Sequence, residues 1–299
     1  MLGLDELPDD EALEHSDEPF HLGPADRAQL LREVFAAQLR DPGATAGATA
    51  GATAGATMEQ RYDAARAERQ LRGQFPVGVF AEAARRLDLE VLARWRAGLG
   101  PIAVGGATRF GFGRASSAGA ELLPALTIEL SGGRTVRLIG QTELLLRGVR
   151  HTSVITMLRE IKKRSHYHLR GAFDHLVLAA AGLAQAGHVH RLIDDRGAVC
   201  EIEHAAWTAD DARGYLAALI GELLDEPHGY VLPFETLARA LGGGRPPSRY
   251  TDPTAGLGYG PIDRGDGLGP PADAAALARR RLAPLVDRMR GDHGFEVSA

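Results

Sequence analysis

The residues of this chain that could do chemistry gather near its middle. The stretch RLIGQTELLL reads as a β-strand, and it places Glu143 three residues after a glycine. Further along, Glu160 and Lys162 stand one residue apart. Cleavage of a phosphodiester by a metal-dependent enzyme needs carboxylates that hold a cation and a base that orients the attacking water. One interpretation is therefore a nuclease site of Glu143, Glu160 and Lys162, with Mg²⁺ as its cofactor.

Three features argue against that interpretation. Glu160 falls at the end of the expected strand, where the chain runs into a basic segment. Glu143 is longer than the aspartate usual at such a position, which would displace a bound metal. A Glu-x-Lys triplet also occurs often by chance. We therefore expect no catalytic residue, no metal and no cofactor, with Glu143 an exposed strand residue and Glu160 paired with a neighbouring base.

A basic segment, REIKKRSHYHLR, covers residues 159–170. Its cations could grip phosphates, and its tyrosine could stack on a base. The alternative is a solvated basic face, or one that docks on an acidic partner. The candidate DNA-binding residues are Arg159, Lys162, Lys163, Arg164, Tyr167 and Arg170. Two weaker basic clusters, RPPSRY at 245–250 and RRR at 279–281, are expected to be solvated surface.

Histidines recur in two pairs, HYH at 166–168 and HVH at 188–190. In an extended chain each pair would lie on one side, where two imidazoles could bind a metal. No cysteine lies nearby, and no spacing indicates a third ligand, so these histidines are expected to be structural or exposed. His175 lies in an apolar helical stretch, where we expect a partly buried side chain with its hydrogen bonds satisfied.

Composition narrows the class of protein. Charged residues make up 24% of the 299 residues, hydrophobic residues make up 44%, and no apolar run approaches the length of a membrane span. We expect a protein of the cytoplasm without membrane contact, because the acidic N-terminus lacks the features of a secretory signal. Cys200 is the only cysteine, which excludes an internal disulfide. The net charge of −5 argues against a protein that coats nucleic acid with its whole surface.

The chain divides by composition into four segments. Residues 1–23 form an acidic, extended lead-in, and residues 24–42 have the apolar spacing of a helix. Residues 43–57 repeat Gly-Ala-Thr-Ala, whose small side chains predict a low-complexity spacer. Residues 58–299 are predicted to form the main domain.

Hydrophobic periodicity predicts an α/β (α+β) domain with a central mixed sheet flanked by helices. Two helices come first, and the second places Phe80, Ala84, Leu87, Val91 and Trp95 on one face. The period then changes to two over 125–161, which predicts a three-strand antiparallel meander. A helix, two further strands joined by the turn DRG, and a helix with a threonine cap follow. The tail holds a short helix, a Gly/Pro-rich loop and a last helix.

This order of elements, with an acid after a glycine on the second strand, resembles the restriction-endonuclease-like core of PD-(D/E)xK nucleases. A more specific resemblance covers nearly the whole chain. Six blocks follow one another as in the C-terminal region of RecC, the gamma subunit of exodeoxyribonuclease V. They are DEPFHLGPADRAQLL, LRGQFPVGVFAEAA, RLIGQTEL, AFDHLVLAAAG, YLAALIGELLDEPHGYVLP and RLAPLV.

The resemblance implies a degenerate nuclease-like fold that has lost its catalytic residues and serves as a DNA-binding scaffold. The expected partners are a RecB-like helicase-nuclease subunit, a RecD-like subunit and DNA ends. Together these subunits form an ATP-dependent exodeoxyribonuclease that acts in double-strand break repair and recombination. The chain lacks the two helicase-like domains that precede this region in RecC, so we expect a truncated or split gamma subunit. A free-standing nuclease and an orphan interaction module are the alternatives.

Overall fold

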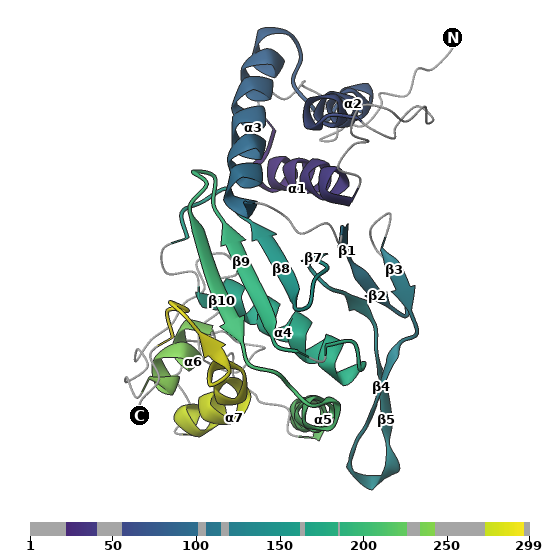
Figure 1. Cartoon of the computed structure of the whole chain (residues 1–299), viewed down its shortest axis with the longest axis vertical. Coiled ribbons are helices and arrows are strands. Elements are labelled where there is room, and N and C mark those ends of the chain that lie inside the picture. The colour runs from purple at the N-terminus through teal and green to yellow at the C-terminus, as the bar shows by residue number, and fades with distance from the viewer. Residues whose placement is uncertain are drawn as a thin grey trace, which may run out of the picture. The chain divides into compact units, whose positions relative to one another are not determined.

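The structure is a computed structural model that describes residues 22–40, 56–100, 106–114, 120–161, 165–184, 186–225, 234–242 and 273–295. Most of the predicted lead-in and most of the predicted spacer lie outside these residues. The chain separates into two compact units (Figure 1). Unit 1 ends at Gly100 and includes the short stretch Asp195–Gly197, and unit 2 contains the rest. The helices expected at 58–99 pack with the first helix in unit 1.

Unit 1 is built from three helices. These are α1 (Pro24–Arg40), α2 (Met58–Leu71) and α3 (Gly78–Leu99). Thr57 caps α2: its hydroxyl accepts from the backbone N–H of Gln60, and the Gln60 side chain accepts from the backbone N–H of Thr57. The buried core of the unit is formed by Leu30, Leu31, Val34, Phe35, Leu39, Tyr62, Phe75, Val91, Leu92, Trp95 and Leu99.

The predicted buried face of α3 was partly wrong. Val91 and Trp95 are buried as expected, but Phe80 and Leu87 are each 53% exposed. An acid, Asp88, takes a place in the core and is 1% exposed. Apolar periodicity did not predict this buried face, because it takes only apolar residues as buried. A carboxylate can also be buried where hydrogen-bond donors contact it.

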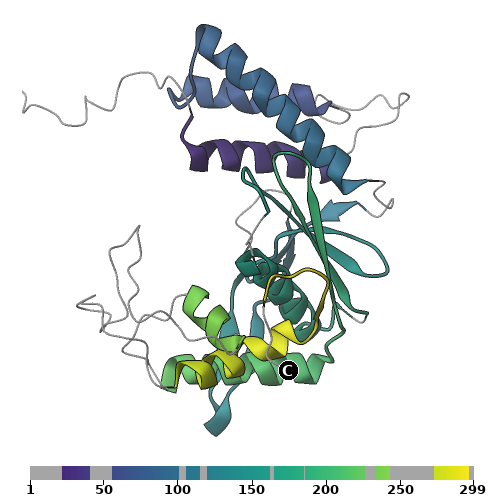
Figure 2. The ribbon, with the colours of Figure 1, turned by 90° about the vertical axis from the view of Figure 1, so that its left-hand side faces the viewer.

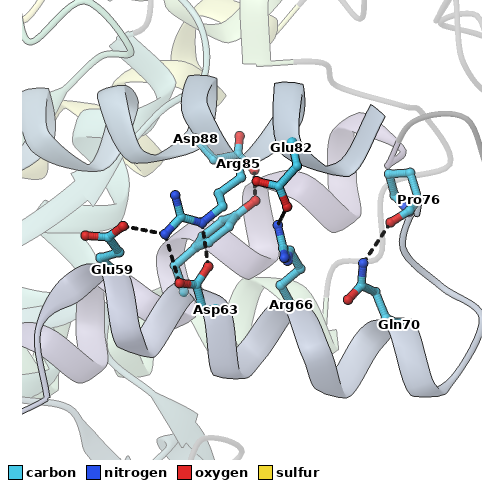
Figure 3. Close-up of polar contacts among 9 residues, drawn as sticks. Glu59, Asp63, Arg66, Gln70, Pro76, Glu82, Arg85 and Asp88 are labelled. Atoms are coloured by element: carbon cyan, nitrogen blue, oxygen red, sulfur yellow. Dashed lines mark hydrogen bonds and ion pairs between the residues drawn. The ribbon is translucent and has the colours of Figure 1, made fainter. Parts of the chain in front are cut away.

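Polar contacts join α2 to α3 along their length (Figure 3). Arg85 of α3 reaches Asp63 of α2 with two hydrogen bonds, of 2.7 and 2.9 Å, and also pairs with Glu59. Deeper between the helices, the Tyr62 hydroxyl donates to Asp88 Oδ2 at 2.7 Å. Arg27 of α1 donates to the other oxygen of Asp88 at 2.6 Å. Asp88 is therefore the point at which the three helices of unit 1 are tied together.

Unit 2 is centred on a mixed sheet of six strands in the order β1-β7-β8-β9-β10-β11. The central pair β8–β9 is parallel, and the pairs β7–β8 and β9–β10 are antiparallel. A sheet of three strands, β3-β2-β6, and the hairpin β4–β5 complete the unit. The strands are β1 (Ala107–Thr108), β2 (Phe110–Phe112), β3 (Glu121–Leu123), β4 (Leu126–Glu129), β5 (Thr135–Leu138), β6 (Gly140–Gln141), β7 (Leu144–Leu146), β8 (His151–Thr156), β9 (His188–Ile193), β10 (Val199–His204) and β11 (Met289–Arg290).

The expected three-strand meander is wrong in its middle strand. The stretch predicted as one strand is divided into β5, β6 and β7, each of which belongs to a different sheet. The first break falls between Leu138 and Gly140, and Gly140 begins β6 with a φ of 155°, which is rare for an L side chain. The chain can therefore turn out of the β4–β5 hairpin there and enter the main sheet at β7. The two strands predicted on either side of the turn DRG are confirmed as β9 and β10.

Helices cover the sheet of unit 2. The helix α4 (Ser165–Ala180) connects β8 to β9 and lies across one face of β8, β9 and β10 (Figures 1 and 2). It is followed after β10 by α5 (Ala209–Asp225), α6 (Phe234–Leu241) and α7 (Ala274–Val286). The predicted threonine cap of α5 is confirmed, since the Thr208 hydroxyl accepts from the N–H of Asp211 at 3.1 Å. Within the described ranges, no helix combines the length and apolar character of a membrane span.

Candidate functional site around Glu143

Glu143 lies between β6 and β7 and not inside a strand as predicted. Its backbone N–H donates to Asp174 Oδ1 at 3.2 Å, and its carboxylate pairs with Arg170 Nη1 at 3.2 Å. Both partners come from α4. The side chain is 28% exposed, so the expectation of an exposed strand residue was wrong. Glu143 is instead held against the middle of α4 by one hydrogen bond and one ion pair.

The strand beside Glu143 lacks the groups of a nuclease. In the register of β7 and β8, Leu144 is opposite Val154. The sequence of β8 is HTSVIT, which contains neither an acid nor a lysine. Glu160 comes four residues after the end of β8, in a stretch without regular structure, and Lys162 lies outside the described residues. The alternative nuclease site would need Glu160 and Lys162 on this strand, but the described strand ends before Glu160.

Asp174 is the carboxyl group closest to Glu143 in the hydrogen-bond network. It is 7% exposed, and the Ser153 hydroxyl donates to its Oδ2 at 2.5 Å. Burial raises the pKa of Asp174 to about 7, the Ser153 hydrogen bond opposes that rise, and the charge of Glu143 adds to it. Asp174 also lines an apolar groove of about 470 Å³ between α4, α5 and the strands β2, β5 and β6.

These groups do not fit Mg²⁺. The cation needs several oxygen ligands, with at least one or two ionised carboxylates free to face it. Here Arg170 already neutralises Glu143, and both oxygens of Asp174 accept hydrogen bonds from the protein. Within the described ranges no group of three or more His, Cys, Asp or Glu is arranged to hold a metal ion.

The structure describes three of the six candidate DNA-binding residues. Lys162, Lys163 and Arg164 lie outside the described residues. Arg159 is exposed, just beyond the end of β8. Tyr167 is half-buried against the apolar cluster of Ile155, Met157 and Leu192, and the guanidinium of Arg170 lies 5.8 Å from the centre of its ring. Tyr167 therefore offers only part of its ring to a base, and Arg170 is shared between Tyr167 and Glu143.

In unit 2, several other arginines are paired with glutamates, which offset their positive charge. On the six-stranded sheet, Arg191 pairs with Glu201, and Arg150 pairs with Glu203 at 3.4 Å. In the RRR cluster, Arg280 and Arg281 both pair with Glu222, at 2.8 and 2.7 Å. The RRR cluster is therefore paired with a neighbouring acid and is not simply solvated. The other weak basic cluster, RPPSRY, lies outside the described residues.

Sequence reasoning missed a group of buried histidines beneath α4. We call the side chains of His168, His175, His188, His190 and His204 the histidine cluster, and each is at most 3% exposed. His175 was expected to be partly buried with its hydrogen bonds satisfied, but both of its ring nitrogens are buried without a partner among the residues that the structure describes. The signals were the HYH and HVH alternations and His175, but their spacing did not reveal that α4, β9 and β10 bring histidines to one interface.

Comparison with known proteins adds no assignment. A scan against models of protein families and a search of curated proteins each find no match to this chain. The resemblance to RecC therefore rests on the six sequence blocks.

Proposed function

We propose that this chain is a non-catalytic, RecC-like scaffold that binds DNA ends as part of a helicase-nuclease in double-strand break repair. Its partners in that role are a RecB-like helicase-nuclease subunit and a RecD-like subunit. The sequence blocks support the family. The observation that carries the non-catalytic role is the ion pair of Glu143 with Arg170 beside a β8 strand without acid or lysine.

The arrangement of the main sheet is compatible with a restriction-endonuclease-like core. In unit 2 an antiparallel pair, β7–β8, is followed by α4 and by β9, which is parallel to β8. An acid precedes β7, where a nuclease of this type would hold its metal. In this chain a cation from α4 meets that acid. In this proposal the chain keeps the nuclease-like arrangement of strands and helix but no longer binds a metal.

The first prediction concerns cleavage. The purified chain should not cut linear duplex or single-stranded DNA in Mg²⁺ or Mn²⁺, because the carboxylates near Glu143 are already engaged. A Glu143→Ala, Lys162→Ala double variant should behave identically in the same assay, which follows fragment lengths on a denaturing gel. Metal-dependent cutting by the natural chain that the double variant lacks would refute the scaffold and establish a nuclease.

The second prediction concerns DNA binding. Arg159 is exposed at the end of β8, and Arg159→Ala should weaken binding to DNA ends a few-fold and lower the salt slope of the affinity by about one. Arg137→Ala is the matched control, because Arg137 is also exposed but lies on the β4–β5 hairpin. Fluorescence anisotropy at several salt concentrations gives both quantities. An equal effect of the two substitutions would show that binding does not involve the predicted segment.

A further inference from the structure

The histidine cluster occupies the interface between α4 and the main sheet. His188 of β9 is directly opposite His204 of β10, and His190 lies two residues further along the same face of β9. From the helix, His175 approaches His188 with ring centres 5.3 Å apart, and His168 approaches His190 at the same separation. Five imidazoles therefore stand where a helix and a sheet would ordinarily bury apolar side chains.

Hydrogen bonding assigns the ring protons of His188. Ser153 has one hydroxyl proton, and while Asp174 is ionised it donates that proton to Asp174, so its oxygen accepts from His188 Nε2 at 2.8 Å. In this ionised state of Asp174 the proton of neutral His188 is on Nε2, and its Nδ1 carries a lone pair. That Nδ1 is buried without a partner among the described residues, as are Nε2 of His190, Nε2 of His204 and both nitrogens of His175.

We propose that the histidine cluster is a pH-sensitive latch, in which proton uptake by His175, His188, His190 and His204 releases α4 from the sheet. A neutral imidazole can be buried at modest cost, whereas several imidazolium ions within about 6 Å of one another in an apolar interior repel strongly and lose their hydration. The helix can lift away and expose all of these rings to water together. The latch is closed while the rings are neutral.

The pKa values of the cluster agree with this direction. Burial, with a smaller contribution from neighbouring positive groups, lowers the pKa of His175 to about 4 and that of His204 to about 3. Burial also lowers the pKa values of His188 and His190 well below the usual value. When α4 has moved off the sheet and water reaches the rings, their pKa values are about 6.5. The closed state is therefore favoured above about pH 6.5 and loses stability as the pH falls toward 4.

Asp174 acts with the opposite sign. Its pKa in the closed state is about 7, so it binds a proton that an open, hydrated carboxyl releases above about pH 4. On opening, four histidines each gain a proton and one carboxyl loses one. The net uptake is therefore about three protons.

Other ionisable groups surround the histidine cluster. They come from α4, from the strands and from the chain after α7, and they face the cluster or one another. These groups are Arg109, Glu143, His151, His168, Arg170, Asp174, Cys200, Arg288, Asp292 and His293.

Hydrogen exchange measured by mass spectrometry on the full chain tests the latch. After correction for intrinsic exchange rates, the opening constant of peptides from α4 should rise by up to about a thousandfold between pH 6 and pH 5. Peptides from α1, α2 and α3 are the internal reference, since the described residues of unit 1 contain no histidine. A change in α4 no larger than that in the reference helices would overturn the proposal.

A pair of variants separates the cluster from a general effect of acid. His175→Leu removes one titrating ring and two buried atoms without partners, so the slope should fall by about one proton and protection at pH 7 should rise. His293→Gln removes a histidine that lies after β11 and outside the cluster but acts on His204, so it should change the slope by less than His175→Leu does. Equal slopes in wild type and His175→Leu would refute the latch.

An experiment on the natural chain covers the case in which His175→Leu does not fold. NMR of the histidine ring protons should show four rings that do not titrate above about pH 6 while α4 remains protected. Titration of these rings near their ordinary pKa, with α4 still protected from exchange, would mean that the closed helix tolerates the charge. That result would also refute the latch.

Discussion

Replacing Gly171 by alanine is expected to lower the free energy of unfolding of unit 2 by about 3 kcal/mol. A Cβ atom at position 171 would lie 2.3 Å from Cγ and 2.6 Å from Cβ of His190, which is closer than such atoms approach in proteins. His190 is fully buried beneath α4 and cannot turn aside without disturbing His168. The helix would have to move off β9, and the packing of the whole interface would loosen.

The matched control for this substitution is Gly214→Ala. Gly214 lies in α5, and a Cβ atom there meets nothing within 4 Å. Alanine should therefore stabilise the helix by up to about 1 kcal/mol. The measurement is urea unfolding with hydrogen exchange of α4 and α5 peptides. A second substitution, His190→Gly, should recover part of the loss in Gly171→Ala because it removes both the ring and the Cβ atom that clash. If Gly171→Ala unfolds like wild type, α4 does not approach β9 as closely as the structure places it.

Replacing Asp88 by alanine is expected to lower the free energy of unfolding of unit 1 by about 3 kcal/mol. The substitution leaves the buried Tyr62 hydroxyl without its acceptor and Arg27 without its ion-pair partner. Tyr62 cannot compensate by ionising, because burial, which is the largest cause of its raised pKa, remains in the variant. The loss therefore reflects a broken junction of all three helices and not one missing surface contact.

Glu90→Ala provides the comparison for Asp88→Ala. Glu90 lies on the same helix and pairs with Arg94 one turn later, but the two side chains are 50% and 47% exposed. An exposed pair of this kind contributes little, so the change should stay within about 0.5 kcal/mol. Urea unfolding with hydrogen exchange of peptides from α1, α2 and α3 gives both values. Comparable losses in the two variants would mean that Asp88 is not the junction of unit 1.

The two proposals for unit 2 concern neighbouring groups with different charges. Glu143 and Arg170 form a pair that is open to solvent on one side, and this pair bears on whether the chain can hold a metal. Asp174, Ser153 and His188 continue from that pair into the buried histidine cluster. DNA cleavage and DNA binding test the first proposal, whereas hydrogen exchange of α4 tests the second, so either can fail without the other.

The sequence by itself determined the local elements of this protein. The helices α1, α2 and α5, and the hairpin of β9 and β10, follow from apolar periodicity, caps and turn residues that act over a few positions. The threonine cap of α5 needs only Thr208 and the N–H of Asp211. The mixed α/β class follows from the order of these elements, because a helix between strands brings the second strand back beside the first.

The tertiary structure decided how residues far apart in the chain meet. It divided the stretch around Glu143 among three sheets, paired Glu143 with Arg170, and buried Asp88 between Tyr62 and Arg27. It also gathered histidines from β9, β10 and α4 at one interface. None of these contacts has a period in the sequence, because each depends on strand register and on how closely a helix approaches a sheet, as at Gly171.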